Sequence, residues 1–318
     1  MWFKQVQLFQ LTDDFRYSPT TLIEKLEELL FQECLPSMPY GAGWVSPVDE
    51  DDAPLIQTMN GYTMICLQIE EKILPPMVIR QELAKKIKQI ESREDRKISP
   101  KEKYALKDEI IAMLLPRAFS KLTRVYAYID TKNRWLILGT ANAKKTEQFM
   151  SAFKKTFDDR IGSFQIKKLS AIMTSWLKNQ NYSSAFSVEK SCVLQDANYE
   201  SRVIRCKEQD LFASSIQSLI KDGCEIKQLA LNWQDRIDFV LLDDLSLQSI
   251  QFTDEIIEQV KEMEAGTKQQ QFNADFLIMT ETLDGLLKDL LNSFTEKQGK
   301  IEKINMDNVV SIDKKVGT

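Results

Sequence analysis

The chain has 318 residues, of which 43% are hydrophobic and 28% charged, with only 10 glycines and 9 prolines. This composition is typical of a globular protein and excludes a collagen-like or wholly disordered chain. Because the sequence contains no histidine and its five cysteines never approach C-x-x-C spacing, Ser-His-Asp catalysis, Cys-His catalysis and an ordinary structural zinc site are excluded. We expect reduced thiols packed in the core, and no cofactor.

The net charge of -5 is distributed very unevenly along the chain. Residues 1–76 carry -8, residues 77–168 carry +11 and residues 169–318 carry -8. A basic segment between two acidic ones predicts a polyanionic partner, since lysines and arginines placed along a duplex release condensed counterions without distinguishing the bases. The alternative is a set of solvated helical faces, because surface helices normally carry mixed charge.

The amino terminus has neither the apolar run nor the cleavage site of a signal peptide. No window of the sequence approaches the roughly 18 consecutive apolar residues of a membrane span. We therefore expect a cytoplasmic protein that does not cross a membrane.

In chain order, the first 76 residues show strand, helix, loop and strand signals. Alternating apolar residues predict a strand from Trp2 to Leu11, and Ser18-Pro19 begins a helix that continues to Phe31. Prolines, glycines and acids predict a loop over Pro36 to Pro54, with a short strand at Gly43-Trp44-Val45. The β-forming residues from Tyr62 to Ile69 then predict a core strand.

The basic segment begins with two predicted helices, Pro76 to Ile90 and Ser99 to Leu115, which form a charged projection. Ser99-Pro100-Lys101-Glu102 places a cap, a proline and an acid in the order of a helix start. An apolar cluster lies near the end of the second helix and contains Leu114, Leu115, Ala118, Phe119 and Leu122.

A hairpin and a helix follow the projection. Val125 to Asp130 and Trp135 to Thr140 are predicted to pair as strands, and Asn142 to Phe157 as a helix. Phe149, Phe153 and Phe157 repeat on one face of that helix. Such a row packs in a core more often than it forms a stacking platform, and we expect the core role.

The last third repeats the mixed pattern. Its predicted strands are Phe186 to Leu194, Val203 to Cys206, Ile226 to Trp233 and Ile237 to Leu242; its predicted helices are Leu211 to Ile220, Asp254 to Met263 and Asn273 to Phe294. Hairpins alternating with single helices predict an α+β fold with mixed or antiparallel sheets.

These elements divide the chain into five predicted parts. We expect an N-terminal α+β part (1–76), a basic helical tip (77–124), a hairpin with a basic helix (125–168), a C-terminal α+β base (169–295) and a flexible tail (296–318).

Motifs for nucleotide or metal chemistry are weak. Neither G-x-G-x-x-G nor G-x-x-x-x-G-K-[ST] occurs, which argues against ATP and NAD binding. Asp243-Asp244, with Asp235, Asp238 and Asp275, would suit a divalent-metal nuclease only if the carboxylates converged on one site. A turn, where aspartates bond to nearby backbone, is the simpler interpretation of Asp243-Asp244-Leu245-Ser246.

The basic residues form the stronger pattern. They occur in groups separated by helical turns and lack interleaved exposed aromatics, which favours contacts to a duplex backbone over a single-strand groove. No helix-turn-helix or zinc-finger reader accompanies them, so we expect binding without sequence preference. The candidate DNA-binding residues are Arg80, Lys86, Arg96, Lys97, Lys101, Lys103, Arg117, Lys121, Arg124, Lys144, Lys145 and Lys207.

Several strings, in order from residue 2 to about 295, resemble the bacterial recombination-associated RdgC family. They are Trp2-Phe3-Lys4, Gly43-Trp44-Val45, Glu70-Glu71-Lys72-Ile73-Leu74-Pro75, Leu106-Lys107-Asp108-Glu109, Leu114-Leu115-Pro116-Arg117-Ala118-Phe119-Ser120, Ile129-Asp130-Thr131, Ala143-Lys144-Lys145, Lys207-Glu208-Gln209-Asp210-Leu211, Leu229-Ala230-Leu231-Asn232-Trp233-Gln234, Arg236-Ile237 and Phe272-Asn273-Ala274-Asp275-Phe276.

The resemblance implies a non-enzymatic, nucleoid-associated DNA-binding protein. Crescent-shaped subunits would form a ring-shaped homodimer that encircles duplex DNA, binds single strands more weakly and restrains RecA-driven recombination. It implies a tip contact at Phe119, with Leu115 and Leu122 beside it, and DNA contacts at Lys144, Lys145 and Lys207. A family basic pair falls on Lys207 and Glu208, so one positive charge is replaced by a negative one.

Two functions of other classes remain as alternatives. One is a protein scaffold whose basic helices bind an acidic partner protein. The other is the divalent-metal nuclease that would use Asp243 and Asp244.

Overall fold

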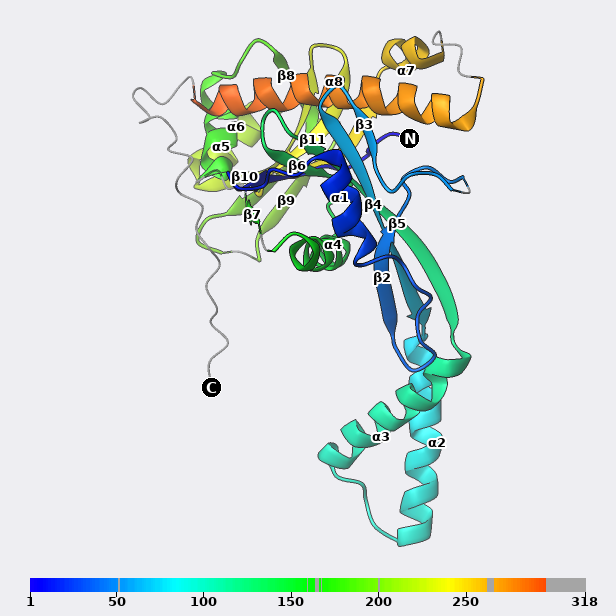
Figure 1. The fold of residues 1–318 in the computed structure, drawn as a ribbon. Coiled ribbons are helices and arrows are strands. Elements are labelled where there is room, and N and C mark those ends of the chain that lie inside the picture. Colours follow the sequence, from blue (N-terminus) through cyan, green and yellow to red (C-terminus); the bar gives the residue numbers. More distant parts are fainter. Residues whose placement is uncertain are drawn as a thin grey trace.

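The computed structural model describes residues 1–50, 52–158, 160–163, 166, 168–199, 201–261 and 266–295. The predicted tail, residues 296–318, lies outside the described residues, as do the last two residues of the helix predicted over Asp254 to Met263. Two antiparallel sheets, a long helix across both and a helical projection make up the fold (Figure 1), so the α+β prediction is confirmed.

The first sheet has seven strands in the order β2-β4-β5-β6-β1-β7, with β3 paired to β4. Their bounds are β1 Gln7–Leu11, β2 Tyr40–Val45, β3 Gln57–Met59, β4 Tyr62–Ile73, β5 Phe119–Asp130, β6 Trp135–Leu138 and β7 Ile161–Ser163. Two helices, α1 (Pro19–Glu27) and α4 (Ala143–Thr156), bury apolar side chains against one face of this sheet. The predicted β5–β6 hairpin is confirmed, with Asp130 paired to Trp135.

Strands β4 and β5 form a long two-stranded ribbon that extends beyond the rest of the sheet. Pairing continues from Tyr62 opposite Asp130 to Ile73 opposite Phe119. The ribbon leads into α2 (Pro76–Glu94), α3 (Pro100–Leu114) and the short helix η1 (Leu115–Arg117), which form the projection in Figure 1. Strand β5 therefore begins six residues before the predicted Val125, within the segment assigned to the apolar cluster.

The projection is thinly packed. Within it Ile98, Ile110 and Leu115 are buried, whereas no residue of α2 is. The predicted start of α3 is confirmed: the Ser99 hydroxyl accepts from the Glu102 N–H, and the Glu102 carboxylate accepts from the Ser99 N–H. Each group satisfies an N–H that the helix leaves without a partner.

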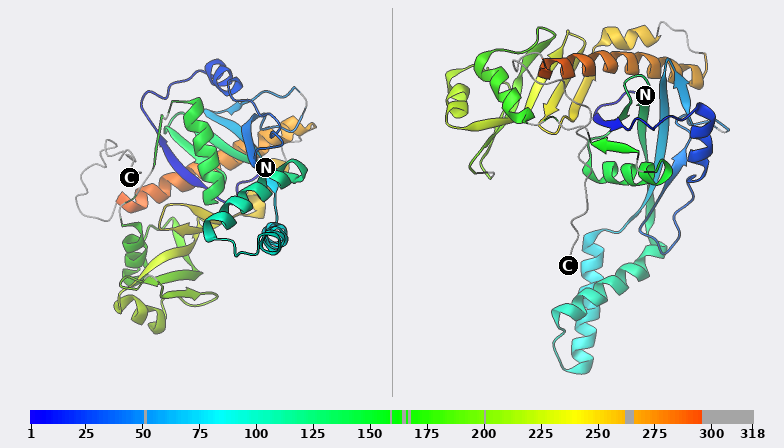
Figure 2. Two further views of the ribbon diagram at one scale, coloured as in Figure 1. Left: turned by 90° about the horizontal axis from the view of Figure 1, so that it is seen from below. Right: turned by 60° about the vertical axis from the view of Figure 1, so that its left-hand side comes forward.

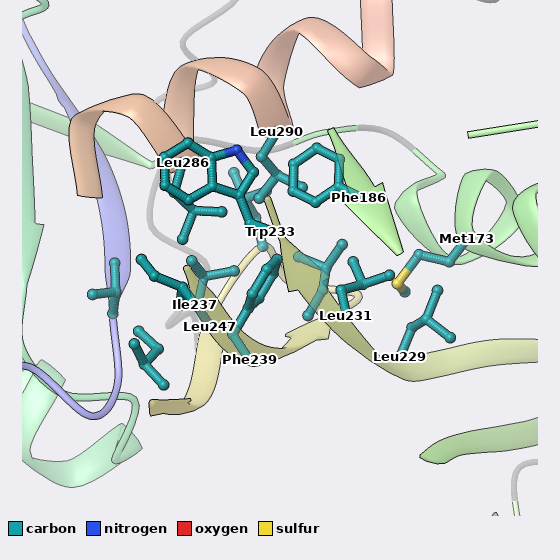
Figure 3. Packing of buried hydrophobic residues seen from close by; sticks show 14 of the residues in the cluster. Met173, Phe186, Leu229, Leu231, Trp233, Ile237, Phe239, Leu247, Leu286 and Leu290 are labelled. Atoms are coloured by element: carbon teal, nitrogen blue, oxygen red, sulfur yellow. The ribbon is translucent and has the colours of Figure 1, made fainter. Parts of the chain in front are cut away.

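The second sheet has five strands in the order β12-β11-β10-β8-β9. The strands are β8 Phe186–Asp196, β9 Val203–Cys206, β10 Cys224–Trp233, β11 Ile237–Leu242 and β12 Leu247–Phe252; the helices of this half are α5 Leu169–Asn179, α6 Ser214–Lys221, α7 Asp254–Lys261 and α8 Lys268–Thr295. Figure 3 shows Trp233 of the sheet beside Leu286 and Leu290 of α8, and Phe239 farther from the helix in the same cluster.

Helices α5, α6 and α8 cover one face of this second sheet, and the same core continues to Met64 and Tyr128 of the first sheet. The buried Asp130 accepts from the Lys132 and Asn133 N–H groups. The Asn133 side chain in turn donates to Asp284 of α8 over 3.0 Å. Helix α8 thus joins both sheets into one base.

The base and the projection enclose an angle, and we call the side within it the concave side. Helix α4 and the β8–β9 hairpin lie on this side (Figure 2, right view), and α3 is the helix of the projection that lies toward it in Figure 1. The thiols contribute to the core as predicted: all five are free and four are buried, and burial raises the pKa of Cys66 to about 12.

Candidate nucleic-acid interface

Helix α4 presents a basic face on the concave side. Phe149, Phe153 and Phe157 are fully buried, which confirms their predicted core role. Lys154 and Lys155 are therefore directed away from the sheet and are exposed, and Lys144, at the start of the helix, is also exposed. The Lys144 ammonium lies 2.7 Å from the Glu71 carboxylate and holds the pKa of that carboxyl below its usual value.

The β4–β5 ribbon separates the predicted residues onto two faces. Side chains alternate along a strand, so Phe119 and Lys121 share the face of Glu71 and helix α4, while Leu122 and Arg124 lie on the opposite face. Arg124 there donates to Asp49 over 2.9 Å and lines a polar recess with Lys268. The structure therefore does not bring Arg124 together with the cations of α4.

At the tip, acidic residues already neutralise part of the predicted basic set. Arg96 bonds to Glu94 and to both carboxylate oxygens of Glu102, and Lys86 lies 2.7 Å from Glu109. The Arg96 guanidinium is the main cause that lowers the pKa of Glu102 to about 2. These pairs reduce the charge that the tip can offer to an anion.

The remaining predicted cations are not held in ion pairs by the described residues. Within the described part of the chain, no ion pair is formed by Arg80, Lys97, Lys101, Lys103, Arg117, Lys121, Lys145 or Lys207. All but Lys145 are exposed. This unpaired set extends along α2 and α3, the ribbon, α4 and the end of β9.

One part of the sequence interpretation is wrong. The basic segment was expected to lack exposed aromatics, but Tyr104 on α3 is 71% exposed, one helical turn from Lys101 and from Lys107. The sequence pattern did not reveal that Tyr104 is exposed, because α3 buries too few apolar residues for its inner and outer faces to be distinguished from the sequence.

Sequence reasoning also missed cations next to Lys207. Arg202 and Arg205 are exposed on the β8–β9 hairpin. They fall in a segment whose net charge is -8, so counting charge along the chain hid them. The alternation in Val203-Ile204-Arg205-Cys206-Lys207 was the available signal, because Cys206 is buried and its neighbours face outward.

The three predicted dimer-contact residues occupy different environments. Phe119 is 84% exposed, Leu122 is 58% exposed on the opposite ribbon face, and Leu115 is buried within the chain. Ile73, directly across the ribbon from Phe119, and Met77 at the start of α2 are also exposed. Phe119, Ile73 and Met77 together give the neck of the projection an apolar surface that the sequence did not predict in full.

The carboxylates considered for a nuclease do not converge. Asp243 lies 3.2 Å from Lys227, and Asp244 accepts from the Ser246 N–H and hydroxyl, which confirms the predicted turn. Asp238 accepts from Asn232, and Asp275 binds the amino terminus. Across the described ranges, no group of three His, Cys, Asp or Glu side chains is arranged to hold a metal ion.

Comparison with known proteins identifies the family. The family model described as "Putative exonuclease, RdgC" matches residues 1–297. The chain belongs to the RdgC family. The recombination-associated protein RdgC of Yersinia enterocolitica (serotype O:8 / biotype 1B) is 35% identical over 299 residues, covering 92% of this chain and 97% of the relative. Its counterpart from Yersinia pestis (strain Pestoides F) is 34% identical with the same coverage.

The RdgC match spans both sheets and the projection, so it applies to the whole arrangement described above. The resemblance drawn from the sequence strings is thereby confirmed. The two RdgC descriptions differ, since the family model names an exonuclease and the relatives a recombination-associated protein. In the described part of this RdgC chain, no helix is long and apolar enough to cross a membrane.

Proposed function

We propose that this protein binds double-stranded DNA without sequence preference, as a ring-shaped homodimer that encircles the duplex and restrains RecA-mediated recombination. The observation that carries the proposal is the set of unpaired cations on α2 and α3, the ribbon, α4 and the end of β9, the elements that border the concave side (Figure 2), in a chain whose net charge is -5. Phosphate contacts from such a surface are independent of base sequence and give strongly salt-dependent affinity. The protein acts by occupying DNA, without a catalytic step.

A closed ring is supported by two features of the projection. Its neck exposes Phe119 and Ile73 side by side, and an exposed apolar patch with a polar surround is typical of a protein contact. A two-fold contact uses the same patch on both subunits and ends growth at the dimer. Two concave sides then face each other, so the positive surfaces surround one duplex while acidic surfaces remain outside.

The test is fluorescence anisotropy with a random-sequence duplex and a single strand of equal length, across a salt series. We expect tighter duplex binding and a steep loss of affinity with salt. Changing Lys144 and Lys145 together to Glu should weaken every duplex equally and reduce the salt slope by about 2, since each lost phosphate contact removes about 0.9. Lys178→Glu with Lys221→Glu, the same charge change on α5 and α6, is the matched control.

Three outcomes would contradict the proposal. No binding by the unaltered chain at low salt would favour the scaffold for an acidic protein. If the variant with Glu at positions 144 and 145 lost affinity for only one duplex sequence, the protein would recognise bases and not the DNA backbone. Cleavage of the recovered DNA in magnesium, lost in Asp243→Asn, would support the exonuclease that the family description names.

The restraint of recombination needs its own measurement. RecA-driven strand exchange should slow as the protein is added, and the variant with Glu at positions 144 and 145 should inhibit less, in proportion to its weaker DNA binding. Equal inhibition by both proteins would show that RecA is affected by a route other than occupied DNA.

A further inference from the structure

The tip of the β8–β9 hairpin holds an exposed tyrosine with a cation against its ring. Tyr199 is 55% exposed, and the guanidinium carbon of Arg202 lies 4.0 Å from the centre of its ring. The Arg202 side chain is itself 65% exposed and makes one ion pair among the described residues, to Asp196 at 3.4 Å. Most of its N–H groups therefore remain available to an acceptor in solution.

Two further cations continue from this pair along β9. Arg205 and Lys207 are exposed and make no ion pair with another described residue, whereas Cys206 between them packs in the core opposite Cys192. Strand alternation therefore places Arg205 and Lys207 on the same outer face. The hairpin hangs from the base on the concave side (Figure 2, right view).

We propose that this hairpin binds single-stranded DNA, with one unpaired base stacked on Tyr199 and the adjoining phosphates held by Arg202, Arg205 and Lys207. Arg202 covers one face of the ring, which leaves the other face to a base. An aromatic ring stacks on any base, so the contact needs no sequence. Inside a duplex the base faces are already stacked on their neighbours, so Tyr199 adds affinity only where bases are unpaired.

This inference rests on the proposed DNA binding and extends it to strands opened during recombination. The chemistry on the hairpin separates two contributions. The cations act on any phosphate chain, while the tyrosine acts on bases. An acidic partner protein would also bind the cations. Only stacking of bases on the tyrosine predicts that a normal strand binds more tightly than an abasic strand.

The test compares three ligands of equal length: a single strand, the same strand made wholly abasic, and the duplex. Tyr199→Ala should weaken the normal strand about tenfold, which corresponds to about 1.4 kcal/mol. It should change the abasic strand and the duplex by less than about twofold. Tyr199→Phe should keep the unaltered affinity for all three, because the ring is retained. Arg202→Ala should weaken both single strands.

Tyr40→Ala removes another exposed tyrosine, on β2 beside Glu71, and is the matched control: because no base is proposed to stack there, it should affect the normal and the abasic strand alike. Equal weakening of the normal and abasic strands by Tyr199→Ala would overturn the stacking contact. Unchanged binding of every ligand would also overturn it, while leaving duplex binding intact. If Tyr199→Ala changed the mass of the assembly in light scattering, the hairpin would be a contact between two copies of the chain and the proposed DNA contact would be overturned. Failure of the unaltered protein to bind any DNA would refute the proposed function itself.

Discussion

Replacing Phe119 by Asp is the sharpest test of the proposed ring. The side chain is 84% exposed in the single chain, so nearly all of its apolar area is available to a partner. Burying a phenylalanine contributes roughly 1.5–3 kcal/mol. A two-fold contact contains the residue twice, which gives about 3–6 kcal/mol, or a dimer weakened about a hundredfold to ten-thousandfold. A buried, unpaired carboxylate would weaken it further.

The dissociation constant of the dimer should be measured by sedimentation or light scattering over a dilution series, and stability by chemical denaturation under conditions where the chain is monomeric. We expect a weaker dimer and monomer stability within about 0.5 kcal/mol of the original, because the residue is on the surface. Leu122→Asp, which places the same charge on the opposite ribbon face, should have a much smaller effect. An unchanged dissociation constant for Phe119→Asp, or equal effects of the two variants, would refute a contact centred on Phe119.

Two predictions concern the folding of single elements. Gly43→Ala should lower the free energy of unfolding by about 1–3 kcal/mol, because an added Cβ would overlap the backbone of Phe31. Gly41→Ala is the control and should fold normally, because its Cβ would lie at an ordinary contact distance of 3.5 Å from Cys34. Denaturant titration of both variants compares their free energies of unfolding. The cap of α3 should weaken in acid: Glu102 has a pKa of about 2 when folded against an ordinary 4.5, so its contribution is complete above about pH 4.5 and is lost as pH falls toward 2. Hydrogen exchange of the α3 amides measures this loss of stability in acid. Glu102→Gln has no carboxyl to titrate and should remove the pH dependence. The same pH dependence in the variant as in the original protein would contradict the role of the contact between Glu102 and Arg96.

Local sequence signals predicted most elements, and several to the residue. Strands β9 and β11 have the predicted bounds, since each apolar run ends at a polar turn. The three-residue strands β3 and β7 were missed because they exist only through pairing with β4 and β1. Helix α5 was missed because Lys168 begins it in a left-handed conformation without a side-chain cap, so the chain carries no start signal there.

The candidate site was harder to predict. The charges can be counted along the sequence, but their positions in space depend on contacts between residues that are far apart in the sequence. Counting charges found the basic segment but could not show that Arg96 and Lys86 are neutralised by Glu102 and Glu109. The error at β5 had a specific consequence. With the strand expected to begin at Val125, alternation could not separate Phe119 and Lys121 from Leu122 and Arg124, which the longer ribbon places on opposite faces.

The paired and unpaired cations should contribute differently to DNA binding. A phosphate that binds Lys144 has to replace the Glu71 carboxylate at 2.7 Å, so one charge-assisted bond is exchanged for another. Lys121 lies directly opposite Glu71 across the ribbon and helps to lower the pKa of that carboxyl, but no ion pair at contact distance joins the two among the described residues, so Lys121 gives up a weaker interaction than Lys144 does when it binds a phosphate. Lys121→Gln should therefore weaken duplex binding more than Lys144→Gln does. Exchanging Glu71 for Gln should strengthen duplex binding by freeing Lys144, and a duplex affinity unaffected by Glu71→Gln would show that Lys144 does not contact phosphate.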